Sequence, residues 1–260
     1  MVSAAKLRRV QEAVQLSKPY LEKLQEMLGA IAGSVHNVKH PLLSVRPVRR
    51  TGYLVITADR GLKGASNANV IRKALLEFRA QDKATYTIFA VGRKGADFFR
   101  RYGYPLGQEV TGIPDSPTYA SVNGLAGDIV RAYSEEQFDE LYLVYNEFVN
   151  AVSQRTVVKK VLPLTDLAQG STAKPVNYLY EPDEEAVLRA LLPKYAETLV
   201  FQAVLDAKAS EHAAQMTAMK NATDAANDMI GQYTLALNRA RQAAITTQIM
   251  EIVGGAEALK

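Results

Sequence analysis

The sequence contains no cysteine and no tryptophan, and it has only three histidines in 260 residues. The absence of cysteine excludes disulfide bonds, thiolate metal sites and a cysteine nucleophile. A histidine-built metal centre would need most of His36, His40 and His212 in one place. No apolar run approaches the roughly 18 residues that a membrane-spanning helix needs. No apolar segment follows the charged residues at 1–9, so we expect no secretory signal.

The residues that are present are typical of a globular protein, because 48% of them are hydrophobic and 22% are charged. The net charge of +4 is unevenly distributed. Residues 1–50 hold nine Lys or Arg and three Glu, a net charge of +6, whereas the rest of the chain carries −2. A basic segment of this kind contacts nucleic acid, anionic lipid or an acidic protein, or it forms a solvated helix face.

A heptad pattern in the first 38 residues is typical of a coiled-coil helix. The seam positions are separated alternately by three and four residues, and only one of them is polar: Leu7, Val10, Val14, Ser17, Leu21, Leu24, Leu28, Ile31 and Val35. Pro19 lies inside this helix and is expected to kink it or to remove a backbone hydrogen bond. Pro41 and Pro47 mark a boundary after the helix.

The segment 51–165 alternates strand and helix patterns. We expect strands at 52–57, 85–91, 141–145 and 156–164, and helices at 67–78, 94–102 and 119–133. Strands that are nearly continuously apolar and that alternate with helices favour parallel pairing with helices on both faces. The segment therefore predicts a small doubly wound, mostly parallel α/β domain.

The segment 183–260 predicts one long helix. Asp183, Glu184 and Glu185 suit its positive amino end. Seam positions from Leu205 to Thr247 alternate by four and three residues, which indicates a left-handed supercoil. A helix over 183–253 is about 100 Å long, and the N-terminal helix is roughly half of that. We expect the two to pair antiparallel, so that the unpaired half of the long helix exposes an apolar seam to another protein.

The fold class is thus α/β, with an antiparallel two-helix coiled coil built from 1–40 and 183–260 and an α/β domain at 51–165. The loop at 60–66 follows a predicted strand and precedes a helix, where a phosphate loop would lie. It matches neither the Walker A pattern nor G-x-G-x-x-G, and Asp59 and Arg60 are expected to anchor a turn. His212 falls on the seam, where we expect a neutral, hydrogen-bonded side chain.

No catalytic set, cofactor site or metal site stands out. Polar residues do interrupt the smooth, alanine-rich end of the long helix: Arg239, Arg241, Gln242, Thr246, Gln248 and Glu251. They form either a solubilising face or a set of directional contacts to a partner. Two further classes stay open, a coiled-coil scaffold and a nucleotide-binding α/β enzyme with helical arms.

Several segments resemble the gamma subunit of bacterial F-type ATP synthase, and the similarity spans the chain. They are 210–214, 216–224, 238–246 and 251–256 in the long helix, and 1–9 and 56–64 elsewhere. The resemblance implies a rotor whose coiled coil lies inside a ring of three alpha and three beta subunits. It implies an α/β domain bound to the epsilon subunit and the c-ring, with nucleotide chemistry on beta and none on this chain.

The resemblance also implies where this chain acts. The chain would be peripheral, at the cytoplasmic face of the bacterial plasma membrane, and held there only through the complex, with no nucleic acid partner. Arg241 and Gln242 match positions that hydrogen-bond a catch loop of beta, and Thr246 and Glu251 match polar positions in the same region. Charge-assisted hydrogen bonds suit this role because they are directional. The basic residues Lys6, Arg8 and Arg9 would pass acidic surfaces of beta.

Three departures from the family pattern stand out. Relatives begin several helical turns before Met1, so we expect the upper N-terminal part of the shaft to be missing. Gln215 replaces an arginine that in many relatives faces an acidic lever of beta. Gln248 replaces a glutamate of the family signature.

Overall fold

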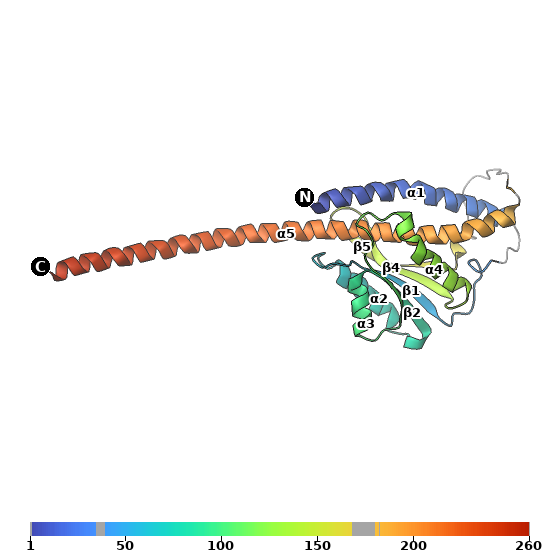
Figure 1. The fold of residues 1–260 in the computed structure, drawn as a ribbon, viewed down its shortest axis with the longest axis horizontal. Coiled ribbons are helices and arrows are strands. Elements are labelled where there is room, and N and C mark those ends of the chain that lie inside the picture. The colour runs from blue at the N-terminus through green and yellow to red at the C-terminus, as the bar shows by residue number, and fades with distance from the viewer. Residues whose placement is uncertain (1, 35–39, 168–179, 182, 260) are drawn as a thin grey trace. The chain divides into compact units, whose positions relative to one another are not determined.

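A computed structural model describes residues 2–34, 40–167, 180–181 and 183–259 (Figure 1). The chain divides into two compact units, Met1–Met216 and Thr217–Lys260. The first unit holds helix α1 (Val2–Ser34), a five-stranded sheet and the beginning of helix α5 (Glu184–Ala258). The rest of α5 forms the second unit. The predicted division into 1–40, 51–165 and 183–260 stays a prediction, and Met1, Val35 and His36 lie outside the described residues.

The sheet has the strand order β3-β2-β1-β4-β5. Its strands are β1 (Thr51–Ile56), β2 (Tyr86–Val91), β3 (Leu106–Val110), β4 (Glu140–Phe148) and β5 (Gln154–Leu162). The first four pair in parallel and β5 pairs antiparallel with β4. Parallel neighbours need crossover connections, and these contain α2 (Ser66–Phe78), α3 (Arg93–Arg101) and α4 (Asn123–Ser134). Short 3₁₀ turns lie at η1 (Lys83–Thr85), η2 (Tyr119–Ser121) and η3 (Thr165–Leu167).

The mostly parallel α/β prediction is confirmed, with three differences. Strand β3 was not predicted, because it is an edge strand whose five residues alternate between half-buried and exposed. Parallel pairing of the last strand is wrong. The segment between β4 and β5 is too short for a crossover, so the two strands form a hairpin. The helix predicted at 119–133 is divided, with Val122 separating η2 from α4.

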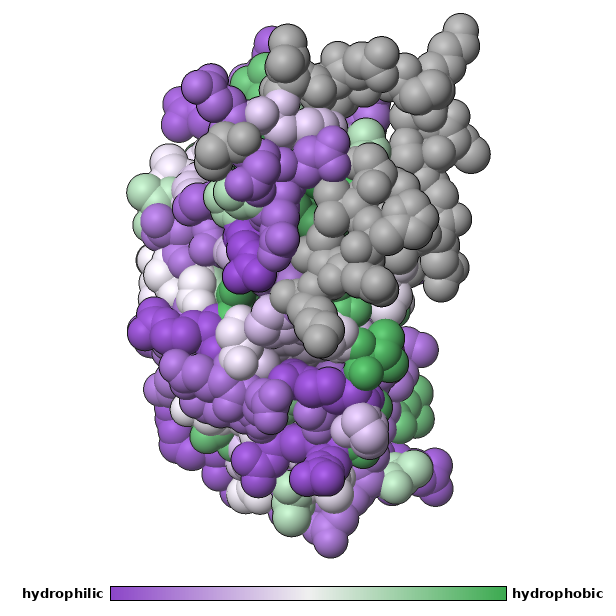
Figure 2. All heavy atoms as spheres, turned by 90° about the vertical axis from the view of Figure 1, so that its right-hand side faces the viewer, coloured by the Kyte–Doolittle hydropathy of each residue, from purple (hydrophilic) through white to green (hydrophobic). Residues whose placement is uncertain are grey.

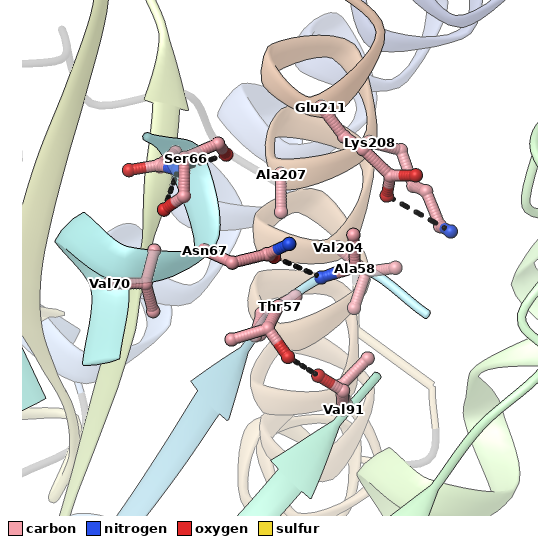
Figure 3. Close-up of a pocket in the computed structure, with 12 residues that line it drawn as sticks. Thr57, Ala58, Ser66, Asn67, Val70, Val91, Val204, Ala207, Lys208 and Glu211 are labelled. Atoms are coloured by element: carbon pink, nitrogen blue, oxygen red, sulfur yellow. Dashed lines mark hydrogen bonds and ion pairs between the residues drawn. The ribbon is translucent and has the colours of Figure 1, made fainter. Parts of the chain in front are cut away.

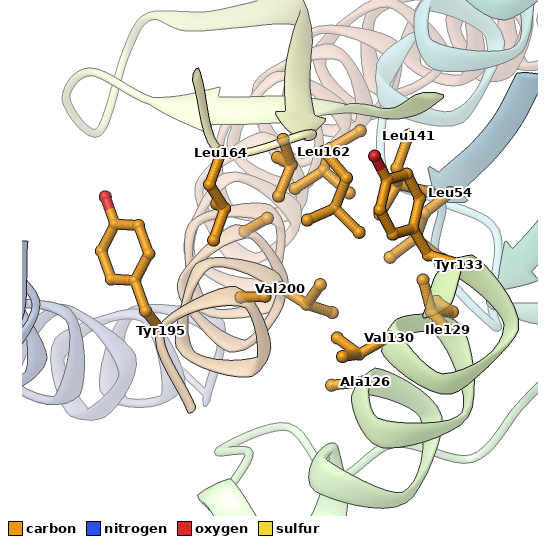
Figure 4. Packing of buried hydrophobic residues seen from close by; sticks show 14 of the residues in the cluster. Leu54, Ala126, Ile129, Val130, Tyr133, Leu141, Leu162, Leu164, Tyr195 and Val200 are labelled. Carbon is orange, nitrogen blue, oxygen red and sulfur yellow. The ribbon is translucent and has the colours of Figure 1, made fainter. Parts of the chain in front are cut away.

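Each face of the sheet has its own core. Helices α2 and α3 cover one face, over an aromatic-rich cluster that includes Tyr53, Phe78 and Phe99. The other face packs against α4 and α5. Figure 4 shows Ile129 and Val130 of α4 near Val200 of α5, beside side chains of the sheet. Every residue of β1 is buried, as expected for a central strand covered on both faces.

Helices α1 and α5 pair antiparallel, as predicted. Leu7, Val10 and Val14 of α1 pack against Leu205, Ala209 and Ala213 of α5. Farther along α1, Leu24, Leu28 and Ile31 belong to the cluster that holds Leu188 and Leu192, near the start of α5. Six of the predicted seam residues of α1 are thus buried. Burial of each such side chain contributes about 1.5–3 kcal/mol, which holds α1 against α5.

Two residues of α1 that could weaken the coiled coil, Ser17 and Pro19, are accommodated in the structure. Ser17, the polar seam residue, is half-buried, and its hydroxyl lies 2.6 Å from Oε1 of Gln202 on α5. Helix α1 continues through Pro19, whose side chain is exposed. The proline removes the N–H that would donate to the carbonyl of Gln15. Both residues lie on the exposed face, where water can bind that carbonyl, and the proline does not end the helix.

Asp206 is the titratable group most strongly altered by the contact between α5 and its neighbours. Burial raises the pKa of its carboxyl to about 6 from 3.8, and Lys18, Lys159 and Glu147 lie within its electrostatic reach. A raised folded-state pKa means that the ionised carboxylate destabilises the fold. The contribution of Asp206 to stability is therefore fully present below about pH 4 and is lost as the pH rises through about 6.

Replacing Asp206 by Asn is expected to raise the Tm of the chain by a few degrees above pH 6, because the amide stays neutral. The gain should shrink as the pH falls from 6 and vanish near 4, where the unfolded carboxyl is protonated too. Thermal unfolding at a series of pH values measures this. A gain that does not change with pH contradicts the assignment to Asp206.

Candidate functional site: the carboxyl edge of the sheet and the exposed part of α5

The carboxyl ends of β1, β2 and β3 meet in loops that one carboxylate ties together. Oδ1 of Asp59 accepts the N–H of Arg93 at 3.0 Å, and Oδ2 accepts the N–H of Gly112 at 3.0 Å. Thr57 adds a second link, because the N–H of Gly95 donates to its Oγ1 at 2.9 Å. The prediction that Asp59 anchors a turn is confirmed.

Helix α5 covers this edge. In Figure 3 Val204, Ala207, Lys208 and Glu211 of α5 face the ends of β1 and β2. The small cavity between them, about 10 Å³, is also lined by Thr57 and by Asn67, whose Oδ1 accepts the N–H of Ala58 at 2.9 Å. Doubly wound sheets bind their ligands in the crevice at this edge. Here residues of the same chain fill most of that position.

A buried ion triad joins the loop after β1 to α5. One carboxylate oxygen of Glu211 lies 3.1 Å from Nζ of Lys63, and the other lies 3.3 Å from Nζ of Lys208. Lys63 also donates to Oε1 of Gln215 at 2.6 Å. All three charged side chains are 10% exposed or less. Gln215 therefore has a partner inside the chain, which the sequence pattern did not reveal.

A second polar group joins α1 and α5 to the loop after β3. Lys6 Nζ lies 2.5 Å from Oδ2 of Asp115, and this hydrogen bond lowers the pKa of the Asp115 carboxyl. Nε2 of His212 lies 3.2 Å from the backbone oxygen of Asp115. Burial lowers the pKa of His212, so the prediction of a neutral, hydrogen-bonded seam histidine is confirmed.

The basic residues of α1 differ in their surroundings. Lys6 pairs inside the chain with Asp115, whereas Arg8 pairs with Glu12 on its own exposed helix face at 3.2 Å. Arg9 is exposed. Arg8 and Arg9 thus lie at the surface, whereas Lys6 forms an ion pair within the first unit.

The polar residues near the end of α5 are all exposed. Arg241, Gln242, Thr246 and Glu251 lie in the second unit, and none has a side-chain partner in the described part of the chain. Gln242 and Thr246 are four residues apart and share a helix face. The second unit therefore presents polar groups whose hydrogen-bonding capacity is unused within the chain.

The apolar seam of α5 is also exposed beyond Met216. Ile230, Tyr233 and Leu237 are 57–69% exposed. Among the described residues no group of three His, Asp or Glu side chains suits a metal ion. A sheet edge covered by its own helix, together with a long helix that exposes an apolar seam, defines the class: a helical shaft carried by an α/β domain.

Comparison with known proteins gives the family. A family model described as ATP synthase matches residues 1–259. The ATP synthase gamma chain of Brevibacillus brevis is 53% identical over 260 residues, which cover 99% of this chain and 90% of the relative. The chain belongs to the ATP synthase gamma-chain family. It is therefore a subunit of an ATPase complex.

Solved structures share the fold. A chain in the Euglena gracilis mitochondrial ATP synthase, rotational state 3, gives a TM-score of 0.64 at 19% identity, covering 98% of this chain and 95% of that chain. A chain in the central stalk and c-ring of the Tetrahymena thermophila mitochondrial enzyme gives 0.58 at 21% identity, covering 86% and 100%.

Proposed function

We propose that this chain is a non-catalytic shaft that couples rotation of a c-ring to conformational cycling of the beta subunits in ATP synthesis and hydrolysis. The exposed seam of α5 in the second unit carries this proposal, because apolar side chains that extend over many helical turns need a protein partner. The proposed partners are three alpha and three beta subunits around that seam, with an epsilon subunit and a c-ring at the α/β domain.

The relatives support these partners. The Euglena structure contains F1 and a c-ring, and the Tetrahymena structure contains the central stalk with its c-ring. The composition of the seam supports them too. Small residues such as Ala226, Ala240 and Ala244 leave the helix surface smooth between its larger side chains. A smooth helix can turn within a surrounding sleeve with few interlocking side chains to resist it.

We further propose that the subunit lies at the cytoplasmic face of the bacterial plasma membrane and is held there only by its complex. In the described part of the chain, no helix is both long and apolar enough to cross a membrane. Figure 2 shows the side of the first unit at the right of Figure 1, where hydrophilic side chains dominate and the hydrophobic ones form small separate patches.

The polar residues at the end of α5 are proposed to contact a catch loop of beta, with Arg241 and Gln242 as the main donors and Thr246 and Glu251 beside them. An arginine offers a planar fork of donors to a carboxylate or carbonyl partner. Such contacts are directional and can be broken and remade as the shaft turns.

Replacing Arg241 and Gln242 together by Ala is expected to slow ATP hydrolysis by the reconstituted complex roughly tenfold, without preventing assembly. A rate falls about tenfold when the transition state of the rate-limiting step loses one charge-assisted hydrogen bond. ATPase activity per assembled complex is the measurement. Lys220→Ala, an exposed position of the second unit outside this polar set, is the matched control. Unchanged activity in the double variant overturns the catch assignment.

The basic residues of α1 are proposed to face acidic surfaces of beta, with Arg8 and Arg9 exposed for this contact and Lys6 tied to Asp115. Reversing the charge of Arg8 and Arg9 to Glu is expected to reduce ATPase activity several-fold, and most strongly at low ionic strength, where exposed charges interact over the longest range. The control reverses Arg72 of α2 and Arg79, the residue that follows α2. Equal effects of both pairs, or no effect, contradict the proposal.

A further inference from the structure

An open cavity of about 600 Å³ lies beside the carboxyl edge of the sheet, next to the buried triad. Its walls are the loop from Asp59 to Lys63, the first residue of α3, the loop from Gly112 to Asp115, the start of α1 and about two turns of α5. Cavities of 300–1,000 Å³ are typical of small-molecule sites. Neither the shaft function nor the triad accounts for a cavity of this size.

The charge that lines the cavity is positive. The cations are Lys6, Arg60, Lys63, Arg93 and Lys208. The three carboxylates, of Asp59, Asp115 and Glu211, leave a net charge of +2. Each carboxylate already has a partner within the chain. Asp59 accepts two backbone N–H groups, Asp115 pairs with Lys6, and Glu211 pairs with the two lysines of the triad.

Two of the cations that line the cavity are arginines whose charge is not paired with a carboxylate in the described residues. Neither Arg60 nor Arg93 has an ion-pair partner in the described ranges, and both are exposed where they line the cavity. Arg60 follows Asp59 in the loop after β1, and Arg93 is the first residue of α3. The N–H of Arg93 donates to Asp59, so the backbones of the two arginines lie close together. Two arginines on neighbouring stretches of backbone suit a compact anion, because each guanidinium presents a fork of donors that fits phosphate oxygens.

The backbone adds further donors. Leu62 and Gly64 have φ angles of 61° and 55°, in the left-handed region. Left-handed residues in a loop turn successive N–H groups toward one side and form anion-binding concavities. Within the described residues, no acceptor receives the N–H groups of residues 61–64.

We propose that this cavity binds a phosphate group, with Arg60 and Arg93 as its principal ligands. The phosphate is either free orthophosphate or the phosphate of a nucleotide. A cavity of about 600 Å³ is large enough for a compact anion. An acidic peptide would need a longer groove. Lys63 and Lys208 raise the local potential without leaving Glu211. This site is separate from the shaft function, which stands whether or not phosphate binds.

The test is calorimetric titration of the full chain with inorganic phosphate, AMP and ATP in separate experiments. Saturable binding of one equivalent is expected. Arg60→Gln and Arg93→Gln should each weaken it about tenfold, as the loss of one charged hydrogen bond does. Arg79→Gln, at the opposite edge of the sheet, removes the same charge and should change nothing. An unaltered Tm shows that each variant is folded.

The ligands distinguish the sources of phosphate. Orthophosphate that binds as tightly as AMP indicates a free phosphate site, and tighter binding of AMP or ATP indicates a nucleotide. A poly-aspartate peptide that displaces phosphate and binds more tightly overturns the proposal in favour of a protein partner. The proposal of a phosphate site is also overturned if no saturable binding is observed, or if neither arginine substitution weakens the binding.

Discussion

Replacing Glu211 by Gln is expected to lower the free energy of unfolding by about 3 kcal/mol or more, because two buried lysines lose their shared counter-charge. The carboxylate lies between Lys63 and Lys208, and all three side chains are 10% exposed or less. Denaturant unfolding followed by circular dichroism measures the change.

A second substitution distinguishes charge from packing. Lys63→Met in the Glu211→Gln background removes one of the two uncompensated charges, so it should restore part of the lost stability. The resulting coupling energy comes from a double-mutant cycle. A loss below about 1 kcal/mol for Glu211→Gln alone contradicts a buried, tightly paired triad.

Replacing Gly92 by Ala is expected to destabilise the chain by at least about 3 kcal/mol. Gly92 has a φ of +89°, and an added Cβ would lie 2.1 Å from the backbone oxygen of Thr57. The end of β1 would have to move away from β2, which disrupts the loop that Asp59 and Thr57 hold in place. The free energy of unfolding again measures the effect.

Gly103→Ala is the matched control for this prediction. Gly103 also has a positive φ, of +64°, but its Cβ would meet nothing within 4 Å. Only backbone strain of about 1 kcal/mol is expected there. If the two variants lose similar stability, the steric argument at Gly92 is wrong.

The coiled coil was predictable because its signal is local. Alternating spacings of three and four place Leu7, Val10 and Val14 on one face, and the structure buries that face against α5. The same reasoning predicted an exposed seam beyond Met216, since α1 is shorter than α5. A repeated apolar pattern shows which face of a helix is buried, even when the rest of the fold is unknown.

The sheet was predictable in its centre and not at its edges. Strands β1, β2 and β4 are apolar enough to be recognised, whereas β3 has only Leu106 and Val110 as large apolar residues. The direction of β5 depends on the length of the hairpin before it, and the apolar pattern of the strand does not contain that information. Edge strands have one face or one side exposed, so their composition resembles that of loops.

The polar contacts were the least predictable part. Lys63 is 152 residues from Gln215, and it meets Gln215 and Glu211 only because α5 crosses the carboxyl edge of the sheet. The same holds for Lys6 and Asp115. The assignments of Arg241, Gln242, Thr246 and Glu251 rest on resemblance to a family, because a helix surface with no partner in the chain gives no geometry to reason from.

The absence of cysteine makes a direct test of the rotor account possible, since one introduced thiol is a unique attachment point. We would assemble the Arg79→Cys chain with alpha and beta subunits, fix the ring to a surface and attach a bead through the thiol. The account predicts that the bead turns continuously in one direction when ATP is added. A bead that shows only thermal motion while the assembled complex hydrolyses ATP would contradict it.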